Sequence, residues 1–586
     1  MRIYRLTIEN FRRIGNADIF LEPATFLVGP NNTGKSSVIA ALEALFSLES
    51  EKMIQNDIYE KEDGTRAEQT VITGYIREIP GDVAASRGFK GRVINGEFIY
   101  RKTLTSSSNK PIIETQEFPY KVKTEFSNAK TIGDLIKAGL EEEEINEAFN
   151  TVDYEIKLKK GWERSVPGAL DFDTEAAPTW VNNPGGIPQN VLSRLPRLLH
   201  VPAITDTKDI ESGEKRYILG ECLSLLFEDL IQGNPVADTI QENLVTLQQQ
   251  MNPGDETSLI SNLLFEVNKI ICEVFPQCGI SITPSLQGLV EVLKPKYDIS
   301  VFSNIKTGVA KQGTGLIRTC VFAMLRHHSK LKIQKELQTR PVIVAFEEPE
   351  QYLHPSAANM LRDTIYTLGK SDQIICSTHS PWMIDLSQDL QSLSRFYLKE
   401  DGSASALNYG ISSKLSILPE DDKWRIKMLQ VFDDELSRVF FAEEVIIVEG
   451  DSEVLSIRET LKLLPPEIQK MIQSRFQIAR ARGKASIISL IKYLKELSIS
   501  PRVMHDGDFG VAGAEIFNDP ISNALNDPQH MVVLTNNLEE VLGYAPPSSD
   551  KPYKAFKYVN AWATAADVPE NWRIAICRLF GIQWPE

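Results

Sequence analysis

The pattern of hydrophobic and polar positions changes several times along the chain, and each change predicts a different element. Residues 2–11 ("RIYRLTIENF") and 16–28 ("NADIFLEPATFLV") alternate apolar with polar side chains, as strands with one buried face do. Residues 29–34 ("GPNNTG") are typical of a loop, and residues 35–48 repeat apolar side chains at helical spacing. This order of strand, loop and helix predicts the start of an α/β domain.

Apolar runs farther along the chain predict more strands. Residues 69–79 and 96–104 alternate again, and residues 197–203 ("RLLHVPA") form another apolar run. Residues 341–350 ("PVIVAFEEPE") and 372–381 ("DQIICSTHSP") are apolar runs that end in polar side chains, which is typical of buried parallel strands.

Two segments interrupt this alternation. Residues 207–280 have helical periodicity with few strand signals, which predicts an inserted helical hairpin or, as an alternative, an oligomerisation surface. Residues 130–190 are acidic and punctuated by proline and glycine, so an irregular segment is expected. Its run of four glutamates, residues 141–144, is interpreted as a solvated helix face.

A second α/β unit is predicted near the C-terminus. Residues 443–455 ("EEVIIVEGDSEVL") place four apolar residues, Val445 to Val448, directly before a group of acids. Residues 484–497 have helical periodicity, and residues 500–510 ("SPRVMHDGDFG") predict the next strand. A helical connector over residues 416–438 is expected to precede this unit.

Composition narrows the class of protein. The chain has 586 residues, which exceeds the size of a single hydrophobic core and predicts two or three units. It is 42% hydrophobic and 24% charged, and its net charge of −16 excludes a chain coated in nucleic acid, so any contact with DNA must use a local basic patch. The N-terminus does not resemble a signal peptide and no run is apolar enough to span a membrane, so a cytoplasmic protein without membrane contact is expected.

The six cysteines contain no C-x-x-C pair. This spacing favours neither a disulfide framework nor a structural zinc site. We expect the cysteines to be reduced.

The loop after the second strand carries a phosphate-binding motif. Gly29, Gly34, Lys35 and Ser36 match G-x-x-x-x-G-K-[ST] between a strand and a helix. The glycines let backbone N–H groups face a phosphate, Lys35 brings a positive charge to the β- and γ-phosphates, and Ser36 offers a hydroxyl to Mg²⁺. ATP and Mg²⁺ are therefore the expected cofactors. The other candidate nucleotide-contacting residues of this loop are Asn31, Asn32 and Ser37.

Two acids and a histidine follow the later strands. Glu347 and Glu348 end the run "VIVAF", where ligands collect in open α/β sheets. Glu347 is the candidate that holds magnesium, and Glu348 the candidate that orients or deprotonates water. His379, in "STHSP", is a candidate γ-phosphate sensor. A pair of exposed strand-end acids and a structural histidine are the alternatives.

Together these motifs resemble an ABC-type ATPase head of the kind found in chromosome-maintenance and double-strand-break-repair ATPases. The resemblance implies that Gly313, Thr314 and Gly315, in "KQGTGLIR", form the signature segment that contacts ATP on the opposite subunit, and hence that the chain dimerises. This segment departs from L-S-G-G-Q, and a helix-capping loop is the alternative. No long heptad repeat separates the two halves of the head.

The acids of the second unit predict a metal site. Glu449, Asp451 and Glu453 follow one strand, and Asp506 and Asp508 follow another about fifty residues later. The ends of two parallel strands can be neighbours, and the clustered carboxylates would then repel one another unless a hard cation such as Mg²⁺ or Mn²⁺ lay between them.

This E…D-x-D arrangement resembles the Toprim domain of topoisomerases, primases and certain nucleases. Arg480, Arg482, Gly483 and Lys484 are a candidate phosphate-binding spot, with a solvated helix start as the alternative. Further candidates are Glu539 as a metal ligand and Lys554 or Lys557 as the group that stabilises charge on a scissile phosphate.

An ABC-type head followed by a Toprim domain resembles the OLD (overcoming lysogenization defect) family of nucleases over nearly the whole chain. The resemblance implies a Rossmann-like α/β Toprim domain after an ATPase domain that carries a helical, probable dimerisation, insertion. The implied divisions are an ATPase first part at 1–206, the insertion at 207–285, an ATPase second part at 286–415, a linker at 416–438 and the Toprim domain at 439–586. One departure is that no arginine follows "HVPA" before Arg216.

The resemblance implies an ATP-regulated DNA endonuclease or nickase that uses two cations, with Glu449, Glu453, Asp506 and Asp508 as ligands and Asp451 as an alternate. It also implies a homodimer or dimer of dimers and a role in defence against phage, beside a helicase-like partner as in Gabija or beside a retron reverse transcriptase with its DNA. A structural or loading ATPase that does not cut is the first alternative. A topoisomerase is the second, although no further domain is left to hold its tyrosine.

Overall fold

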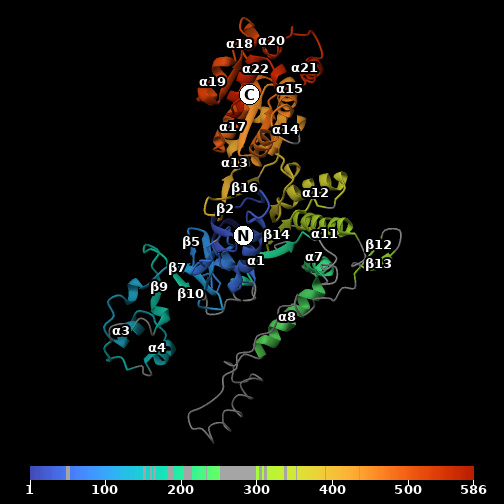
Figure 1. The fold of residues 1–586 in the computed structure, drawn as a ribbon. Coiled ribbons are helices and arrows are strands. Elements are labelled where there is room, and N and C mark those ends of the chain that lie inside the picture. The colour runs from blue at the N-terminus through green and yellow to red at the C-terminus, as the bar shows by residue number, and fades with distance from the viewer. Residues whose placement is uncertain are drawn as a thin grey trace. The chain divides into compact units, whose positions relative to one another are not determined.

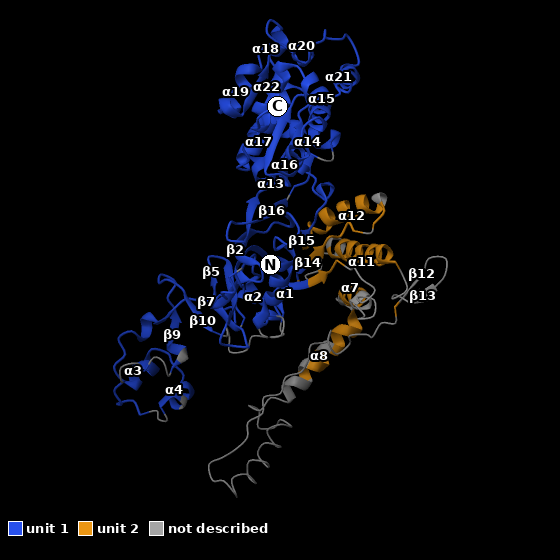
Figure 2. Cartoon of the chain, in the orientation of Figure 1, with its two compact units in different colours: residues 1–198, 341–343, 375–586 blue, residues 199–340, 344–374 orange. Residues whose placement is uncertain are grey.

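A computed structural model of the chain (Figure 1) describes most of its residues. The described residues are 1–585 apart from 48–52, 62, 87, 150–152, 159–161, 163–165, 183–190, 204–213, 232–233, 251–298, 303–305, 309–312, 336–339, 352, 390 and 434–435. They divide into two compact units, coloured separately in Figure 2. Unit 1 comprises residues 1–198, 341–343 and 375–586, and unit 2 comprises residues 199–340 and 344–374.

Antiparallel strands open unit 1, as the alternating pattern predicts. The first two strands of the chain pair antiparallel, with Arg5 opposite Phe20. The first strand also pairs antiparallel with the strand at Gln69–Arg77. The strands of this part are β1 (Arg2–Phe11), β2 (Ile14–Phe20), β3 (Ala24–Val28), β4 (Gln69–Arg77), β5 (Val93–Ile94), β6 (Glu97–Thr105), β7 (Ile112–Glu117), β10 (Thr179–Asn182), β16 (Gln391–Leu398) and β17 (Ala404–Tyr409).

These strands join a mixed sheet. Its order is β10-β7-β6-β4-β1-β2-β17-β16-β3-β15-β14-β11, where β11 is Arg197–Val201, β14 is Val342–Glu347 and β15 is Gln373–Ser377. The apolar runs at residues 197–203, 341–350 and 372–381 are therefore strands, as predicted. β3 pairs with β16 in parallel, and all five of its residues are buried.

Helix α1 (Lys35–Phe46) follows β3 after the loop at residues 29–34 and is buried along most of its length. Its C-terminal end meets Lys102 of β6, whose Nζ donates to the carbonyl oxygen of Ser47 at 2.7 Å. A positive charge there complements the helix dipole. Lys102 is only 2% exposed, however, and burial lowers its pKa to about 8.

We expect Lys102→Met to be more stable than the wild type at pH 7. The buried ammonium costs folding on the order of 3 kcal/mol, against about 1 kcal/mol for the hydrogen bond that methionine loses. Because the folded pKa lies below the unfolded value, this cost is complete below about pH 8 and disappears as the pH approaches about 10.5. Thermal unfolding from pH 7 to 9.5 should show the gap between the two proteins shrinking. A gap that stays constant with pH would contradict this assignment.

The segment expected to be irregular has local order of its own. It holds α3 (Ile132–Lys137), α4 (Glu142–Phe149) and β9 (Leu170–Phe172), which pairs with β8 (Tyr120–Val122) just before the segment. The expectation was wrong because Ile132, Leu135 and Ile145 form a small core that the proline and glycine signals obscured. Of the glutamate run, Glu142 and Glu143 are exposed at the start of α4, as interpreted, whereas Glu141 precedes the helix and Glu144 is half-buried and accepts the N–H of Gly168.

Unit 2 is mainly helical. Its elements include α7 (Glu214–Ile231), α8 (Pro235–Gln250), α11 (Thr314–Lys335) and α12 (Pro355–Leu368), with the short strands β12 (Ser300–Phe302) and β13 (Lys306–Gly308). α7 and α8 bear out the helical periodicity that begins near residue 207. The remainder of that predicted segment, residues 251–280, lies outside the described residues.

The second α/β segment predicted from the sequence lies in the C-terminal part of unit 1. Its four strands are all parallel, in the order β19-β18-β20-β21. They are β18 (Glu444–Val448), β19 (Phe476–Arg480), β20 (Arg502–Asp506) and β21 (Met531–Leu534). The helices are α13 (Ile411–Ser416), α14 (Glu420–Phe432), α15 (Asp451–Lys462), α16 (Pro466–Arg475), α17 (Lys484–Glu496), α18 (Ala512–Glu515), α19 (Asn518–Leu525), α20 (Leu538–Leu542), α21 (Lys551–Val559) and α22 (Glu570–Phe580).

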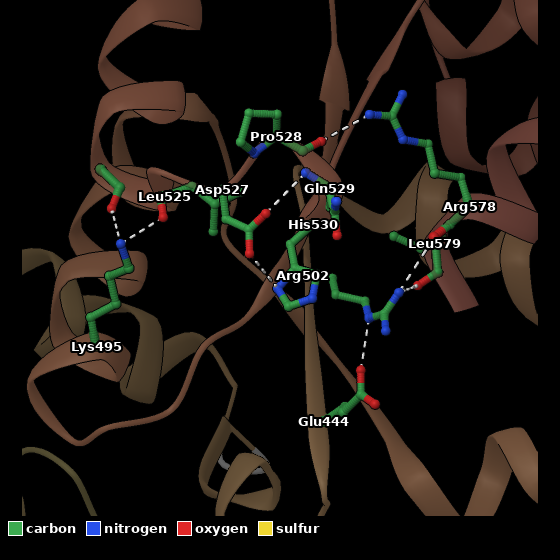
Figure 3. Close-up of polar contacts among 11 residues, drawn as sticks. Glu444, Lys495, Arg502, Leu525, Asp527, Pro528, Gln529, His530, Arg578 and Leu579 are labelled. Atoms are coloured by element: carbon green, nitrogen blue, oxygen red, sulfur yellow. Dashed lines mark hydrogen bonds and ion pairs between the residues drawn. The ribbon is translucent and has the colours of Figure 1, made fainter. Parts of the chain in front are cut away.

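Basic side chains secure the edge of this sheet where the strands begin (Figure 3). Arg502 donates to Glu444 at 2.7 Å, and to the carbonyl oxygens of Arg578 and Leu579 at the end of α22. Lys495 donates to the last carbonyl oxygens of α19, those of Ala524 and Leu525. These contacts satisfy helix C-termini that lack partners within the helix, and they leave the opposite edge of the sheet for a site.

Among the helices of the described residues, none is both long and apolar enough to cross a membrane.

Candidate nucleotide and metal sites

The phosphate-binding motif has the backbone of a loop that wraps an anion. Gly29 has φ +142° and Gly34 has φ +99°, and an added Cβ at Gly29 would lie 2.4 Å from the carbonyl oxygen of Phe396, so both glycines are required. The Nζ of Lys35 donates to the carbonyl oxygens of Gly29 and Pro30, at 2.9 and 2.8 Å. The ammonium is thus already held inside the loop that a phosphate would enter. Asn31, Asn32 and Ser36 are exposed on this loop and the first helical turn, and Ser37 is half-buried.

An arginine that sequence reasoning missed also reaches this loop. Nη1 of Arg13, in the turn between β1 and β2, donates to the carbonyl oxygen of Asn32 at 3.2 Å. Its side chain is exposed and brings a second positive charge to the phosphate loop. The only local signal is its place in the pair "RR" just before a strand, which by itself does not indicate a ligand.

His379 lies on the loop that follows β15 and is exposed. The preceding residue, Thr378, donates its N–H to the carbonyl oxygen of Leu27 in β3 at 3.0 Å. The histidine therefore follows a strand end that is hydrogen-bonded to the strand leading into the phosphate loop.

The two strand-end glutamates lie in unit 2. Glu347 ends β14, and its Oε2 lies 3.4 Å from the backbone nitrogen of Ala203 and 3.8 Å from Nε2 of His200. Both neighbours belong to the "HVPA" segment that lacks the expected arginine, so the segment supports the acid through its own histidine and backbone. Glu348 has φ +42°, a strained conformation for a residue with a side chain, and such strain concentrates at functional sites.

Arg318 fixes the backbone beside Glu348 and was not singled out from the sequence. It is 1% exposed, and its Nη1 donates to the carbonyl oxygens of Glu348 at 2.6 Å and Gln351 at 3.1 Å. It stands four residues after Thr314, the first residue of α11. The proposed signature residues are exposed or half-buried at the start of this helix, namely Gly313, Thr314 and Gly315.

The acids of the second α/β unit do meet at one edge of the sheet. β18 pairs in parallel with β20, with Val448 opposite Met504, so Glu449 and Asp506 follow neighbouring strands at the same edge. A pocket opens there, and Arg482 and Lys551 bring positive charge to it. Its lining residues are Glu449, Gly450, Asp451, Ser452, Glu453, Arg482, Gly483, Asp506, Leu538, Glu539 and Lys551.

The buried carboxylates of this pocket resist ionisation. Burial raises the pKa of Asp506 to about 8, and repulsion from Glu453, Glu449 and other neighbouring carboxylates adds to the shift. Burial likewise raises the pKa of Glu453 to about 7, and the pKa of Glu449 is raised for the same reason. The cluster is therefore electrostatically unsatisfied without a cation.

Two oxygens of this pocket fit a metal ion. Oε2 of Glu449 and Oδ1 of Asp506 are buried and have no hydrogen-bond partner among the described residues. Oxygen ligands of this kind suit Mg²⁺ or Mn²⁺. As the side chains stand, no three His, Cys, Asp or Glu residues in the described part of the chain converge closely enough to hold an ion, so binding would draw them together. Glu453 also receives the N–H of Gly450 at 2.9 Å, which caps α15 and fixes its position.

Other predicted site residues have different partners. Asp451 pairs with Arg480 at 2.8 Å, and Asp508 pairs with Lys484 at 2.7 Å. Arg480 and Lys484 are thus engaged by acids, and the phosphate-binding spot that the sequence suggested stays a prediction. Arg482 is exposed and lines the pocket.

Glu539 and one lysine of α21 complete the pocket. Glu539 is buried, and its Oε1 lies 3.7 Å from Nζ of Lys551. Lys551 lines the pocket, whereas Lys554 and Lys557, one and two helical turns later, do not. Of the lysines in "KPYKAFKY", the first is therefore the one that lines the pocket.

Comparison with known proteins supports both halves of this description. The family model described as "AAA ATPase domain" matches residues 1–384, and the model described as "Overcoming lysogenization defect protein-like, TOPRIM domain" matches residues 440–508. The first match contains the phosphate loop and His379, and the second ends at Asp508.

Two relatives align over most of the chain, and a third aligns over about a third of it. Old nuclease of Escherichia phage P2 is 24% identical over 522 residues, which cover 87% of this chain and 78% of the relative. Endonuclease GajA of Bacillus cereus (strain VD045) is 20% identical over 80% of this chain and 69% of the relative. OLD nuclease of Thermus scotoductus (strain ATCC 700910 / SA-01) is 27% identical over 36% of this chain and 42% of the relative.

Among solved structures, the SMC head domain from Thermotoga maritima aligns with 69% of this chain and 98% of that chain at 12% identity. Its TM-score is 0.30, which is too low to bear on the fold. The two family matches carry the assignment instead. The chain belongs to the AAA ATPase domain family and carries, at residues 440–508, an overcoming lysogenization defect protein-like TOPRIM domain.

Proposed function

We propose that this protein is an ATP-regulated DNA endonuclease or nickase that requires a divalent cation. The observation that carries the proposal is the pair of buried, unpartnered carboxylate oxygens of Glu449 and Asp506 at adjacent strand ends, in a pocket that also has cationic side chains. A surface that only bound DNA would gain nothing from clustered acids, because they repel phosphate. The two relatives that align over most of their length are both named nucleases.

Glu449 and Asp506 are the proposed principal metal ligands, and Glu453 and Glu539 are proposed to complete the site. A bound Mg²⁺ or Mn²⁺ would activate water and stabilise the leaving oxygen. The raised pKa of Asp506 reflects the same deficit of positive charge that a cation would fill.

Arg482 and Lys551 are the proposed contacts to the DNA backbone. Both line the acidic pocket. Because the chain has a net charge of −16, contacts to phosphate must be local, and these two side chains provide positive charge where the scissile phosphate would lie.

The ATPase domain is proposed to regulate cutting. Lys35 and Ser36 would bind the phosphates and Mg²⁺, Glu347 is the proposed magnesium ligand of its strand, Glu348 would orient water, and His379 would sense the γ-phosphate. Gly313–Gly315 is proposed to contact ATP of a second copy, which makes the active form a homodimer or a dimer of dimers. We also propose a role in defence against phage, which the similarity to Endonuclease GajA supports. The proposed partner is a helicase-like protein or a retron reverse transcriptase with its DNA.

The first test is cleavage of supercoiled plasmid by the purified protein. We expect nicked or linear product with Mg²⁺ or Mn²⁺, no product in EDTA, and a rate that changes when ATP is added, because ATP binding would control access to the TOPRIM domain. Product that forms equally in EDTA would contradict the metal site. Intact plasmid under every condition, together with plasmid retained in a gel shift, would favour a DNA-binding ATPase that does not cut.

A further inference from the structure

Lys484 is a buried lysine in an unfavourable place. It is the first residue of α17, where the helix dipole opposes a positive charge, and its side chain is 3% exposed. Its ammonium lies 2.7 Å from Oδ2 of Asp508 and donates to Oδ1 of Asn518 at 3.0 Å. A buried charge of this kind requires a charged partner, and Asp508 is that partner.

Several hydrogen bonds hold the residues around this ion pair in place. The side-chain amide of Asn518 donates to the carbonyl oxygen of Gly507 at 2.6 Å, which ties the residue between the two aspartates to the same network. The N–H of Asp508 donates to the carbonyl oxygen of Asn536 at 2.7 Å. The backbone of Asp508 and the Asn518 side chain that accepts from Lys484 are therefore both held in place around the ion pair.

Asp508 is paired with a cation, although its charge still contributes to raising the pKa of Glu449 and of Asp506. Glu449 and Asp506 line the acidic pocket, and Asp508 is not among its lining residues. Lys484 nevertheless lies close enough to lower the pKa of Glu449 against the effect of burial. Its charge therefore acts on the pocket although its Nζ is bound to Asp508.

We propose that Lys484 is a built-in cation that takes the place of a second metal ion, so that the TOPRIM domain binds one divalent cation rather than two. This inference rests on the proposed function, because it assumes that Glu449 and Asp506 hold a metal. A carboxylate neutralised by an ammonium attracts a cation weakly, and the ammonium repels any divalent ion placed beside Asp508. This proposal takes the place of the expectation that two cations act together with Asp508 as a ligand.

Counting bound Mn²⁺ tests the proposal without measuring cleavage. The full-length, nucleotide-free protein is titrated with Mn²⁺, and free ion is followed by electron paramagnetic resonance. Site-specific ions are those that a Glu449→Ala, Asp506→Ala double variant fails to bind. We expect one such ion in the wild type and two in Lys484→Met, because loss of the ammonium releases Asp508. Lys495→Met, which alters a lysine at the other end of the same helix, should bind one (Figure 3).

Asp508→Asn supplies an independent result if Lys484→Met does not fold, as judged by circular dichroism. We expect Asp508→Asn to bind one ion, like the wild type. Two ions in the wild type, falling to one in Asp508→Asn, would overturn the inference and leave the proposed function intact. A wild type that binds no more Mn²⁺ than the double variant would overturn the proposed function as well, so the two failures are distinguishable.

Discussion

Lys35→Ala is expected to lower ATP turnover by about 100-fold or more while the fold stays intact. In the free protein the ammonium of Lys35 is bound to the carbonyl oxygens of Gly29 and Pro30, within the loop that would receive the β- and γ-phosphates. Alanine removes the charge that would stabilise the transferring phosphoryl group. The measurement is phosphate release at saturating ATP, with the melting temperature recorded for the same preparation.

Lys102→Met is the matched control for this variant. Lys102 is also a buried lysine that donates to a backbone carbonyl oxygen, but it lies at the opposite end of α1 from the phosphate loop. We expect it to change stability and to leave ATP turnover within about twofold of the wild type. Wild-type turnover in Lys35→Ala would contradict the nucleotide site. Equal loss in both variants would mean that the helix, and not the ammonium of Lys35, is what turnover depends on.

Glu449→Ala and Asp506→Asn are each expected to weaken Mn²⁺ binding and plasmid cleavage by at least about 100-fold. Glu449→Ala removes one of the two buried oxygens that have no hydrogen-bond partner among the described residues, and Asp506→Asn removes the negative charge of the carboxylate that carries the other. Because each also removes a repelling charge from a crowded cluster, we expect the folded protein to be at least as stable as the wild type. ATP turnover without DNA should stay within about twofold of the wild type.

Asp527→Asn is the control for these two variants. Asp527 lies at the opposite edge of the same sheet, where it accepts the N–H of Gln529 (Figure 3). We expect normal Mn²⁺ binding and cleavage from it. Full cleavage by either Glu449→Ala or Asp506→Asn would rule out that residue as a metal ligand.

Much of the fold could be predicted because the relevant signals are local. The alternation in residues 2–11 reflects the period of a strand with one buried face, and the continuous run from Val445 to Val448 is typical of a strand buried on both faces; both segments are strands. The segment near Ile132 was misjudged as irregular because its small core depends on contacts that extend to residue Val166, which no window of local sequence contains.

The candidate sites also differ in how far local sequence reveals their residues. The phosphate loop is continuous in sequence, so its spacing alone identified Lys35 and Ser36. The acidic pocket contains residues from strands and helices that are distant in sequence. The sequence indicated its acids only through their positions after predicted strands. Arg318 carries no motif, and its role beside Glu348 appears only when α11 packs against the end of β14.

The sequence by itself determined that the chain has a nucleotide loop and two groups of acids that follow buried strands, since these features depend on spacing within a few residues. Only the tertiary structure decided which charges pair. It bound Asp508 to Lys484 and Asp451 to Arg480, left oxygens of Glu449 and Asp506 unpartnered, and placed Lys551 rather than Lys554 on the pocket. The reason is physical: a side chain's partner depends on strand order and on its position along each packed helix, and residues one turn apart share a helix face but lie about 5 Å apart along its axis.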